Sequence, residues 1–465
     1  MDQPEAVPER QLPGKASREL PVIRPHVAGI DIGSRQMCVC GPVDQEGRRE
    51  VRTYGTTTEE IGACLQWLKQ QRVESVALES TGVYWIPVLE ILEAGGLEVL
   101  LVDTRPLSRV PGRKTDVIDC EWIQILHSHG LLQGCFRPSE AISMLRSLVR
   151  QKAVLVADQA DWVRRMHKCL DQMNVRVHHA VADTQGTTGM AIIRAIVGGE
   201  RDALKLAALR DPRCQKSQEQ IAALLNGHWR ADHLFNLEQS LKVYDSLAER
   251  LAEYERQIQE QMQRLTPPEN DDRTAPPVRN PAKAKAMKRR RQEPKRQALF
   301  RMAGADLTAI DSINVETAEV VVSEYGFDLS RFATEKQFVA HLQLAPRNSV
   351  SGGKPLKKRR RKPKGTRTAQ ALRNAATTLR NSSTALGAYY RRIARTKGAS
   401  VAVFATARKL ATLIYRMLRW GQPYVDIGQQ AYEDMYQAIR RRWLAATAAQ
   451  LGYELTPKTQ PATGS

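Results

Sequence analysis

Short apolar segments, separated by turn residues and by helical stretches, dominate the first 135 residues and constrain the fold of that region most strongly. The segment VAGIDIGSRQMCVCGPV at 27–43 predicts a strand, a Gly-Ser turn and a second strand, and a third strand is expected from Glu50 to Tyr54. The later elements are expected as a helix at 58–71, a strand at 75–80, a helix at 83–96, a strand at 97–103 and a helix at 115–131. Three strands followed by alternating helices and strands predict an α/β domain with a mixed sheet.

The whole chain of 465 residues is too long for one ordinary core, so two or three domains are expected. Helical patterns fill the middle of the chain, and a mostly helical second domain follows a Pro-rich, Lys/Arg-rich stretch. The predicted organisation is a disordered tail at 1–25, the α/β domain at 26–135, a helical region at 136–265, a basic linker at 266–297, the second domain at 298–424, and a C-terminal helix and tail at 425–465. The composition of the linker predicts disorder when it is alone.

Apolar residues recur every seven positions at the end of the helical region, which is typical of a coiled coil. One set of heptad positions holds Leu237, Tyr244, Leu251, Ile258 and Leu265. The partner positions are apolar except at Glu255, the only misfit. The pattern fits a coiled coil between subunits and equally fits one long helix packed inside its own chain, so both interpretations stay open.

The chain has 70 Lys and Arg against 50 Asp and Glu, a formal net charge of +20. A surplus of this size, gathered in clusters, favours a polyanionic partner, and nucleic acid is the commonest one. The alternative is a basic protein that is merely soluble.

The chain has no apolar run that approaches the ~20 residues of a membrane span, and its charged, Pro-rich start lacks the apolar stretch of a secretory signal. We therefore expect a cytoplasmic protein. Its seven scattered cysteines include no second pair at zinc-finger spacing, so they are expected to be reduced thiols.

Four acidic residues of the α/β region stand in positions that suit a metal site. Asp31 lies in the middle of an apolar strand, where a charge is costly without a partner, and Glu79 ends the 75–80 strand. Asp116 and Asp119 open a helix three residues apart, so they share one face. Hard divalent ions such as Mg²⁺ prefer oxygen ligands of this kind, and two such ions can assist cleavage of a phosphodiester. Taken singly, Asp31 also fits a buried hydrogen-bonded residue, and Asp116 a carboxylate favoured by the helix N-terminus.

A serine in the second domain precedes two glycines and an uninterrupted basic run. Ser351 stands directly before Gly352 and Gly353, which allow close backbone approach. The basic residues that follow, with no acid among them, are Lys354, Lys357, Lys358, Arg359, Arg360, Arg361, Lys362, Lys364 and Arg367. Their density predicts a phosphate-binding surface, beside which a serine hydroxyl can act as a nucleophile. By themselves these residues also fit a flexible Ser-Gly turn with a solvated basic tail.

The motifs VAGIDIGS, VALESTGVYW and RKTDVIDCEW resemble the Asp–Glu–Asp–Asp set of a RuvC-like nuclease domain, and more specifically the DEDD-type transposases of insertion-sequence family one-ten. The resemblance implies a ribonuclease-H-like fold for 26–135 that binds magnesium, expected as two ions, through Asp31, Glu79, Asp116 and Asp119 as catalytic ligands. The segment LAPRNSVSGGK resembles the signature of the C-terminal transposase domain of the same family. This second resemblance implies that Ser351 attacks DNA and becomes joined to it, with Ser349 as the alternative serine.

The resemblance spans roughly residues 26–424 and implies a transposase that recombines the DNA of its own insertion sequence at the bacterial nucleoid. It further implies a structured guide RNA from the element and a homodimer or homotetramer with active sites shared between subunits. Ser312 and Asn314 stand where the family often has the glycines of a helix-hairpin-helix, which predicts a hairpin with weakened DNA contact. Two other functions remain: a metal-dependent nuclease of the Holliday-junction type without a covalent intermediate, and a non-catalytic nucleic-acid-binding scaffold.

Overall fold

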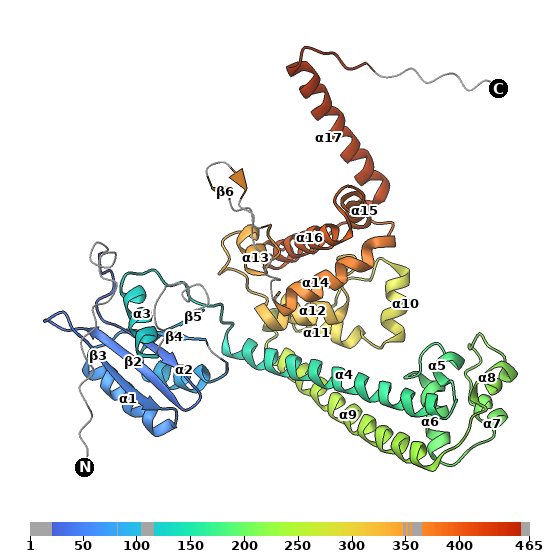
Figure 1. Ribbon diagram of the computed structural model, residues 1–465. Coiled ribbons are helices and arrows are strands. Elements are labelled where there is room, and N and C mark those ends of the chain that lie inside the picture. The colour runs from blue at the N-terminus through green and yellow to red at the C-terminus, as the bar shows by residue number, and fades with distance from the viewer. Residues whose placement is uncertain are drawn as a thin grey trace. The chain divides into compact units, whose positions relative to one another are not determined.

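The computed structural model describes residues 21–80, 82–103, 116–346, 350–351, 354–355 and 365–456. The chain divides into two compact units, Met1–Arg137 and Pro138–Ser465 (Figure 1). None of the described helices is long and apolar enough to cross a membrane.

The first unit is built on a sheet whose strand order is β3-β2-β1-β4-β5. Strands β1, β2 and β3 pair antiparallel, whereas β4 and β5 continue the sheet parallel to β1. The strands are β1 (Val27–Ile32), β2 (Gln36–Val43), β3 (Arg49–Gly55), β4 (Ser75–Glu79) and β5 (Glu98–Val102). This mixed sheet confirms the predicted α/β class and agrees with a RuvC-like domain.

Helices cover both faces of this sheet. Alternate residues of β1 and β4, such as Ile30 and Leu78, form a buried core with α1 (Thr58–Gln70) and α2 (Trp85–Ala94). The opposite face carries α3 (Asp116–Ser128), which packs against β1 and β2. The period of two along each strand therefore separates a large apolar core from the face that bears Asp31.

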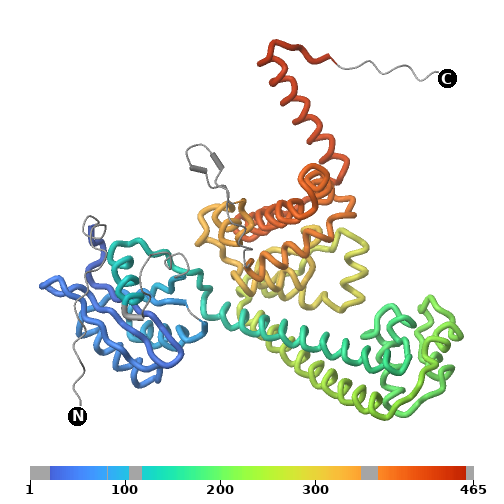
Figure 2. Tube along the Cα trace, viewed as in Figure 1, coloured from blue at the N-terminus to red at the C-terminus, as the bar shows by residue number. Residues whose placement is uncertain are grey.

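The second unit begins with two long helices packed side by side, α4 (Glu140–Gln172) and α9 (Ala231–Arg264) (Figures 1 and 2). At one end of the pair they share a buried core with α5 (Val177–Ala180), α6 (Thr187–Val197), α7 (Ala203–Ala208) and α8 (Gln218–Leu225). Leu237 and Leu241, two of the heptad residues, are buried in this core. The heptads thus pack inside their own chain, which is one of the two arrangements that the sequence left open.

The C-terminal domain is mostly helical, as predicted. Its helices are α11 (Glu293–Ala303), α12 (Val315–Tyr325), α13 (Glu335–His341), α14 (Arg367–Thr378), α15 (Ala385–Lys397), α16 (Ala399–Trp420) and α17 (Gly428–Gln450), with short 3-10 turns at Leu307–Ala309 and Leu379–Asn381. Tyr415 of α16 and Phe338 of α13 are fully buried, and the Tyr415 hydroxyl donates to the Phe332 carbonyl at 2.6 Å. This bond satisfies the one polar atom of a large core side chain.

Part of the linker predicted at 266–297 is helical where it meets this domain. It contains a 3-10 turn at Pro268–Asn270 and the helix α10 (Pro281–Arg289). Lys283 donates to the carbonyls of Thr308, Ile310 and Ile313, and Met287 is buried. Because these contacts come from the folded domain, disorder of the linker when it is alone stays a prediction.

Four charged residues join α4, α9, α11 and α12. The Lys152 ammonium lies 2.6 Å from Glu319 and 3.2 Å from Glu255, and Lys295 lies 2.9 Å from Glu319 and 2.5 Å from Glu255. The Glu319 side chain is only 3% exposed. The two lysines hold the pKa of Glu255 below its usual range although burial opposes them. The charged misfit of the heptads is therefore the residue that pairs α9 with the C-terminal domain.

We predict that Glu319→Gln lowers the free energy of unfolding of the second unit by about 3–5 kcal/mol, because it leaves two buried lysines facing one carboxylate. Urea unfolding of the full chain measures this change. Glu253→Gln makes the same substitution at an exposed ion pair on α9 and should change stability by less than about 1 kcal/mol. Equal stability of the two variants would show that the cluster does not hold the helices together.

Candidate active site

Asp31 and Glu79 lie side by side at the carboxyl ends of two neighbouring parallel strands. The register between β1 and β4 pairs Ile30 with Leu78, so the next residue on each strand is Asp31 or Glu79. Both side chains are partly buried and lie on the same face, because paired positions of adjacent strands point the same way. Adjacent strands are about 4.8 Å apart, which places the two carboxylates within reach of one ion.

Gly29 lets α3 pack directly on this face. A Cβ at Gly29 would lie 2.4 Å from the Gln124 nitrogen and 2.5 Å from the Cys120 carbonyl oxygen, both backbone atoms of α3. Because glycine alone has no Cβ, only a glycine at this position leaves room for α3 to cross β1. Asp31 follows Gly29 by two positions, so its side chain points toward the same helix.

The direction of α3 brings its first turn to the carboxyl edge of the sheet. Cys120 lies over Gly29, Gln124 donates to the Val27 carbonyl at 3.4 Å, and further along His127 Nε2 lies 2.9 Å from the Ser75 hydroxyl. The helix thus runs against β1 and β4, and its N-terminus points to their carboxyl ends. Asp119, which is partly buried, is in that first turn. The backbone of Asp116 opens the helix, but its side chain lies outside the described residues.

Three buried cysteines lie on the same side of the sheet as these acids. Cys38, Cys40 and Cys120 pack together between the sheet and α3. Burial raises the pKa of Cys40 to about 12, and it raises that of Cys120 as well, with smaller contributions from Cys40, Cys38, Glu121 and Asp31. The contribution of Asp31 places its charge beside the first turns of α3. Because burial keeps Cys40 and Cys120 protonated near neutral pH, carboxylate oxygens are the donors that this edge offers.

The acids present have the chemistry of a divalent-metal site, but the described residues alone do not complete one. No group of three or more His, Cys, Asp or Glu side chains among them could hold a metal ion. The backbone brings Asp31, Glu79 and Asp119 to one edge, and Asp116 stands one helical turn before Asp119. None of the seven cysteines, all of which the structure describes, forms a disulfide bond.

The serine loop forms a hairpin in the part of it that is described. Strands β6 (Val350–Ser351) and β7 (Lys354–Pro355) pair antiparallel, with Ser351 opposite Lys354. The side chains of both residues, and the whole of Ser349 and of Lys357, Lys358, Arg359, Arg360, Arg361, Lys362 and Lys364, lie outside the described residues. Arg367 is described and exposed, and it opens α14, whose first turn contains no acid.

The segment 306–326, predicted as a hairpin, contains the 3-10 turn Leu307–Ala309 and α12, and between them a serine takes the backbone conformation that glycine would favour. Ser312 has φ of 72°, and its hydroxyl has no hydrogen-bond partner among the described residues. Asn314 caps α12 by accepting from the Thr317 nitrogen at 2.8 Å. The turn therefore keeps the geometry of a helical hairpin, although Ser312, which has a Cβ, must adopt a left-handed backbone conformation that glycine adopts more easily.

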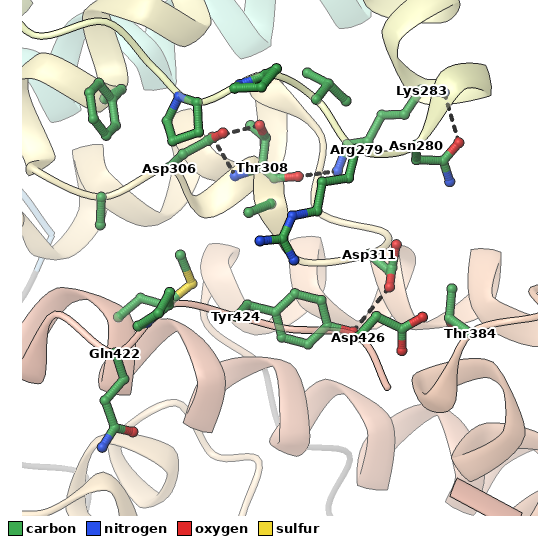
Figure 3. Close-up of a pocket in the computed structure, with 18 of the residues that line it drawn as sticks. Arg279, Asn280, Lys283, Asp306, Thr308, Asp311, Thr384, Gln422, Tyr424 and Asp426 are labelled. Atoms are coloured by element: carbon green, nitrogen blue, oxygen red, sulfur yellow. Dashed lines mark hydrogen bonds between the residues drawn. The ribbon is translucent and has the colours of Figure 1, made fainter. Parts of the chain in front are cut away.

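Beside this hairpin is a cavity of about 640 Å³ that sequence reasoning did not find (Figure 3). The Tyr424 hydroxyl donates to Asp311 at 3.0 Å, and burial raises the pKa of Asp311. Burial also lowers the pKa of Lys283 to about 8, despite the nearby negative charges of Asp311 and Asp306. The lining comes from segments near residues 280, 306 and 424, which share no local pattern that could have revealed it.

Two family models match the chain, one over each region that carries candidate catalytic residues. Residues 28–175 match the DEDD transposase model of IS110, and residues 284–391 match the model described as transposase of the IS116/IS110/IS902 family. The chain belongs to the IS110 family of transposases. No protein of curated function matches it. Membership establishes a DNA transposase or recombinase whose DEDD domain depends in general on a divalent metal.

The residues that sequence reasoning missed in this transposase are those that seat α3. Gly29 and Gln124 carry no charge and no catalytic signature, and only the packing of the helix on β1 shows their role. A glycine inside a strand is the one available signal, because it often marks close approach of another backbone.

We predict that Gly29→Ala pushes α3 off the sheet and lowers the free energy of unfolding of the first unit by about 2–3 kcal/mol. DNA cleavage should fall with it, because Asp119 moves away from Asp31 and Glu79. Denaturant unfolding and a cleavage assay measure the two effects. Gly62→Ala on α1 is the control, since its Cβ would meet nothing within 4 Å, and it should be neutral or stabilise by about 1 kcal/mol. A fully active and stable Gly29→Ala protein would contradict the role of Gly29 in the packing of α3 on β1.

Proposed function

We propose that this transposase cuts and rejoins the DNA of its own insertion sequence with a carboxylate site in 26–135 and a serine nucleophile in 298–424. The observation that carries the proposal is the placement of Asp31 and Glu79 at adjacent strand ends, under the helical turn that holds Asp119. Asp116 is proposed as the fourth acid. Ser351 is proposed as the nucleophile, in a hairpin that places it opposite Lys354.

The four carboxylates would hold divalent metal, proposed to be two Mg²⁺ ions, which would polarise the scissile phosphate. The Ser351 hydroxyl releases its proton as its oxygen forms a bond to phosphorus, the bond from phosphorus to the leaving DNA oxygen breaks, and the leaving oxygen takes up a proton. The product is a phosphoserine ester that conserves the energy of the broken bond. Attack by a DNA hydroxyl on this ester releases Ser351 and rejoins the strand, so no nucleotide cofactor is needed.

The basic residues from Lys354 to Arg367 are proposed to bind the phosphates of the nucleic acid. The ammonium group of lysine and the guanidinium group of arginine neutralise phosphate charge and stabilise the charge that develops during attack. Arg367 adds a cation at the N-terminus of α14, where backbone N–H groups already favour an anion. The formal charge of +20 fits this role along the whole chain.

We predict that Asp31→Asn and Glu79→Gln each slow strand cleavage by several orders of magnitude while DNA binding persists, because each removes a metal ligand. Calorimetric titration with Mg²⁺ should lose its heat of binding in both variants, which gives a readout independent of activity. Glu90→Gln on the exposed surface of α2 is the matched control and should behave as the unsubstituted protein. Cleavage at the full rate by Asp31→Asn would rule out the carboxylate site.

We predict that Ser351→Ala abolishes a covalent protein–DNA adduct and leaves DNA binding intact. Labelled substrate DNA, denaturation and protease treatment reveal the adduct as a shifted band that protease removes. Ser349→Ala is the matched control and should keep the band. The reverse result would make Ser349 the nucleophile, and cleavage with no adduct in any variant would favour the nuclease of the Holliday-junction type.

We propose further that an RNA of the element guides this transposase, that two or four subunits share their active sites, and that they work on cytoplasmic, nucleoid DNA. A discrete RNA from the non-coding flank should co-purify with the protein, and its binding should weaken steeply with salt. RNase treatment should stop recombination. Recombination that continues after complete RNase treatment would instead indicate an enzyme that needs only protein and DNA.

A further inference from the structure

Three backbone carbonyls of the hairpin segment 306–326 converge on one positive charge. Lys283 reaches from α10 into the turn between the two helices of this segment (Figure 3). Its ammonium group donates to the carbonyls of Thr308, Ile310 and Ile313, the last two at 3.1 and 2.7 Å. An ammonium group has three N–H donors, so these carbonyls engage all of them.

The turn supports the position of these oxygens through hydrogen bonds of its own. At its start, Asp306 accepts from the Thr308 nitrogen at 3.0 Å. At its end, Asn314 accepts from the Thr317 nitrogen at 2.8 Å and caps α12. Neither bond involves the lysine. We therefore expect the three oxygens to keep their arrangement when the group between them changes.

The carbonyls lie where an unpaired acceptor is costly and a positive charge is welcome. The three residues that carry them are at most 3% exposed, so water reaches their backbone poorly. Burial lowers the pKa of Lys283 to about 8, but Asp311 and Asp306 oppose this shift with their negative charge. The surroundings therefore supply two carboxylates that stabilise a cation at this position, one of them shared with Arg296 at 2.5 Å.

Neutral carbonyl oxygens around one point suit a large monovalent cation such as K⁺. Backbone carbonyls can replace the water shell of K⁺, whereas Mg²⁺ needs shorter bonds and loses its water reluctantly. An ammonium group resembles K⁺ in charge and in size. The cavity of about 640 Å³ beside the hairpin is lined by Lys283 and Asp311, so a small ion can approach the carbonyls from it.

We infer that the carbonyls of Thr308, Ile310 and Ile313 form a site for a monovalent cation, which Lys283 fills with its own ammonium group. The lysine also ties the linker to the hairpin, because Met287 follows one helical turn later and is buried on the same side of α10. The hairpin thus keeps its cation at any concentration of potassium. The inference does not depend on the carboxylate site or on the serine nucleophile.

Emptying the site in the full chain tests the inference, because the hairpin should then depend on an added ion. Urea unfolding of Lys283→Ala is followed in potassium, ammonium and choline chloride at equal concentration, choline being too large to enter. We expect the midpoint of the second unit to be about 0.5–1 M higher in potassium and ammonium chloride than in choline chloride. The unsubstituted protein, whose site is filled, gives the general effect of each salt, which is subtracted.

Two further variants separate this site from general effects of charge and packing. Lys285→Ala removes an exposed lysine from the same helix and should respond to the three salts as the unsubstituted protein does. Lys283→Met places a methyl group between the carbonyls and leaves no room for an ion. It should be less stable than the unsubstituted protein in every salt, and potassium should not restore it.

The same salts decide the case in which Lys283→Ala does not fold in choline chloride. Potassium or ammonium chloride should then restore its helical circular dichroism on refolding from urea, because either ion can take the place of the lost ammonium group. A variant that stays unfolded in all three salts would overturn the inference. A folded variant with no preference for potassium or ammonium would overturn it too, since water would then fill the space.

Discussion

Two lysines held between two glutamates are the interaction on which the larger unit depends. Lys152 and Lys295 each contact both Glu255 and Glu319, and these residues come from four different helices. Nearby, Arg150 of α4 makes a bidentate pair with Glu324 of α12. Buried charges tolerate little displacement because each needs its partner. The cluster therefore fixes α4 and α9 against α11 and α12 of the C-terminal domain.

In the first unit a close backbone contact has the corresponding role. Without a side chain at Gly29, α3 lies directly on β1, and its N-terminus reaches the strand ends that carry Asp31 and Glu79. Cys38, Cys40 and Cys120 are buried together at this helix–sheet contact. The candidate site is thus a consequence of how one helix is seated, and not only of which acids the chain contains.

Much of the fold and of the candidate site could be predicted from local patterns. The strands of the mixed sheet were placed to within a residue or two, because alternation of side chains along a strand is a local property. The acids on strand, strand and helix were predicted to form a metal site, which stays a prediction, and the register of β1 with β4 sets Asp31 beside Glu79. The docking of the linker on the C-terminal domain could not be predicted, because Lys283 contacts carbonyls about 25 to 30 residues away, which composition does not encode.

The sequence by itself determined the α/β class of the first unit, the helical nature of the rest, the family and the residues proposed for chemistry. Each of these follows from residue type and short-range spacing. Tertiary structure alone decided that the heptads of α9 pack on α4 of the same chain, that Glu255 is paired and not a misfit, and that Gly29 seats α3. It also decided that Met435, Ile439 and Trp443 of α17 are exposed among the described residues, since the same amphipathic pattern fits a buried helix equally well. Burial and charge pairing are properties of neighbours distant in sequence, and only the folded chain brings those neighbours together.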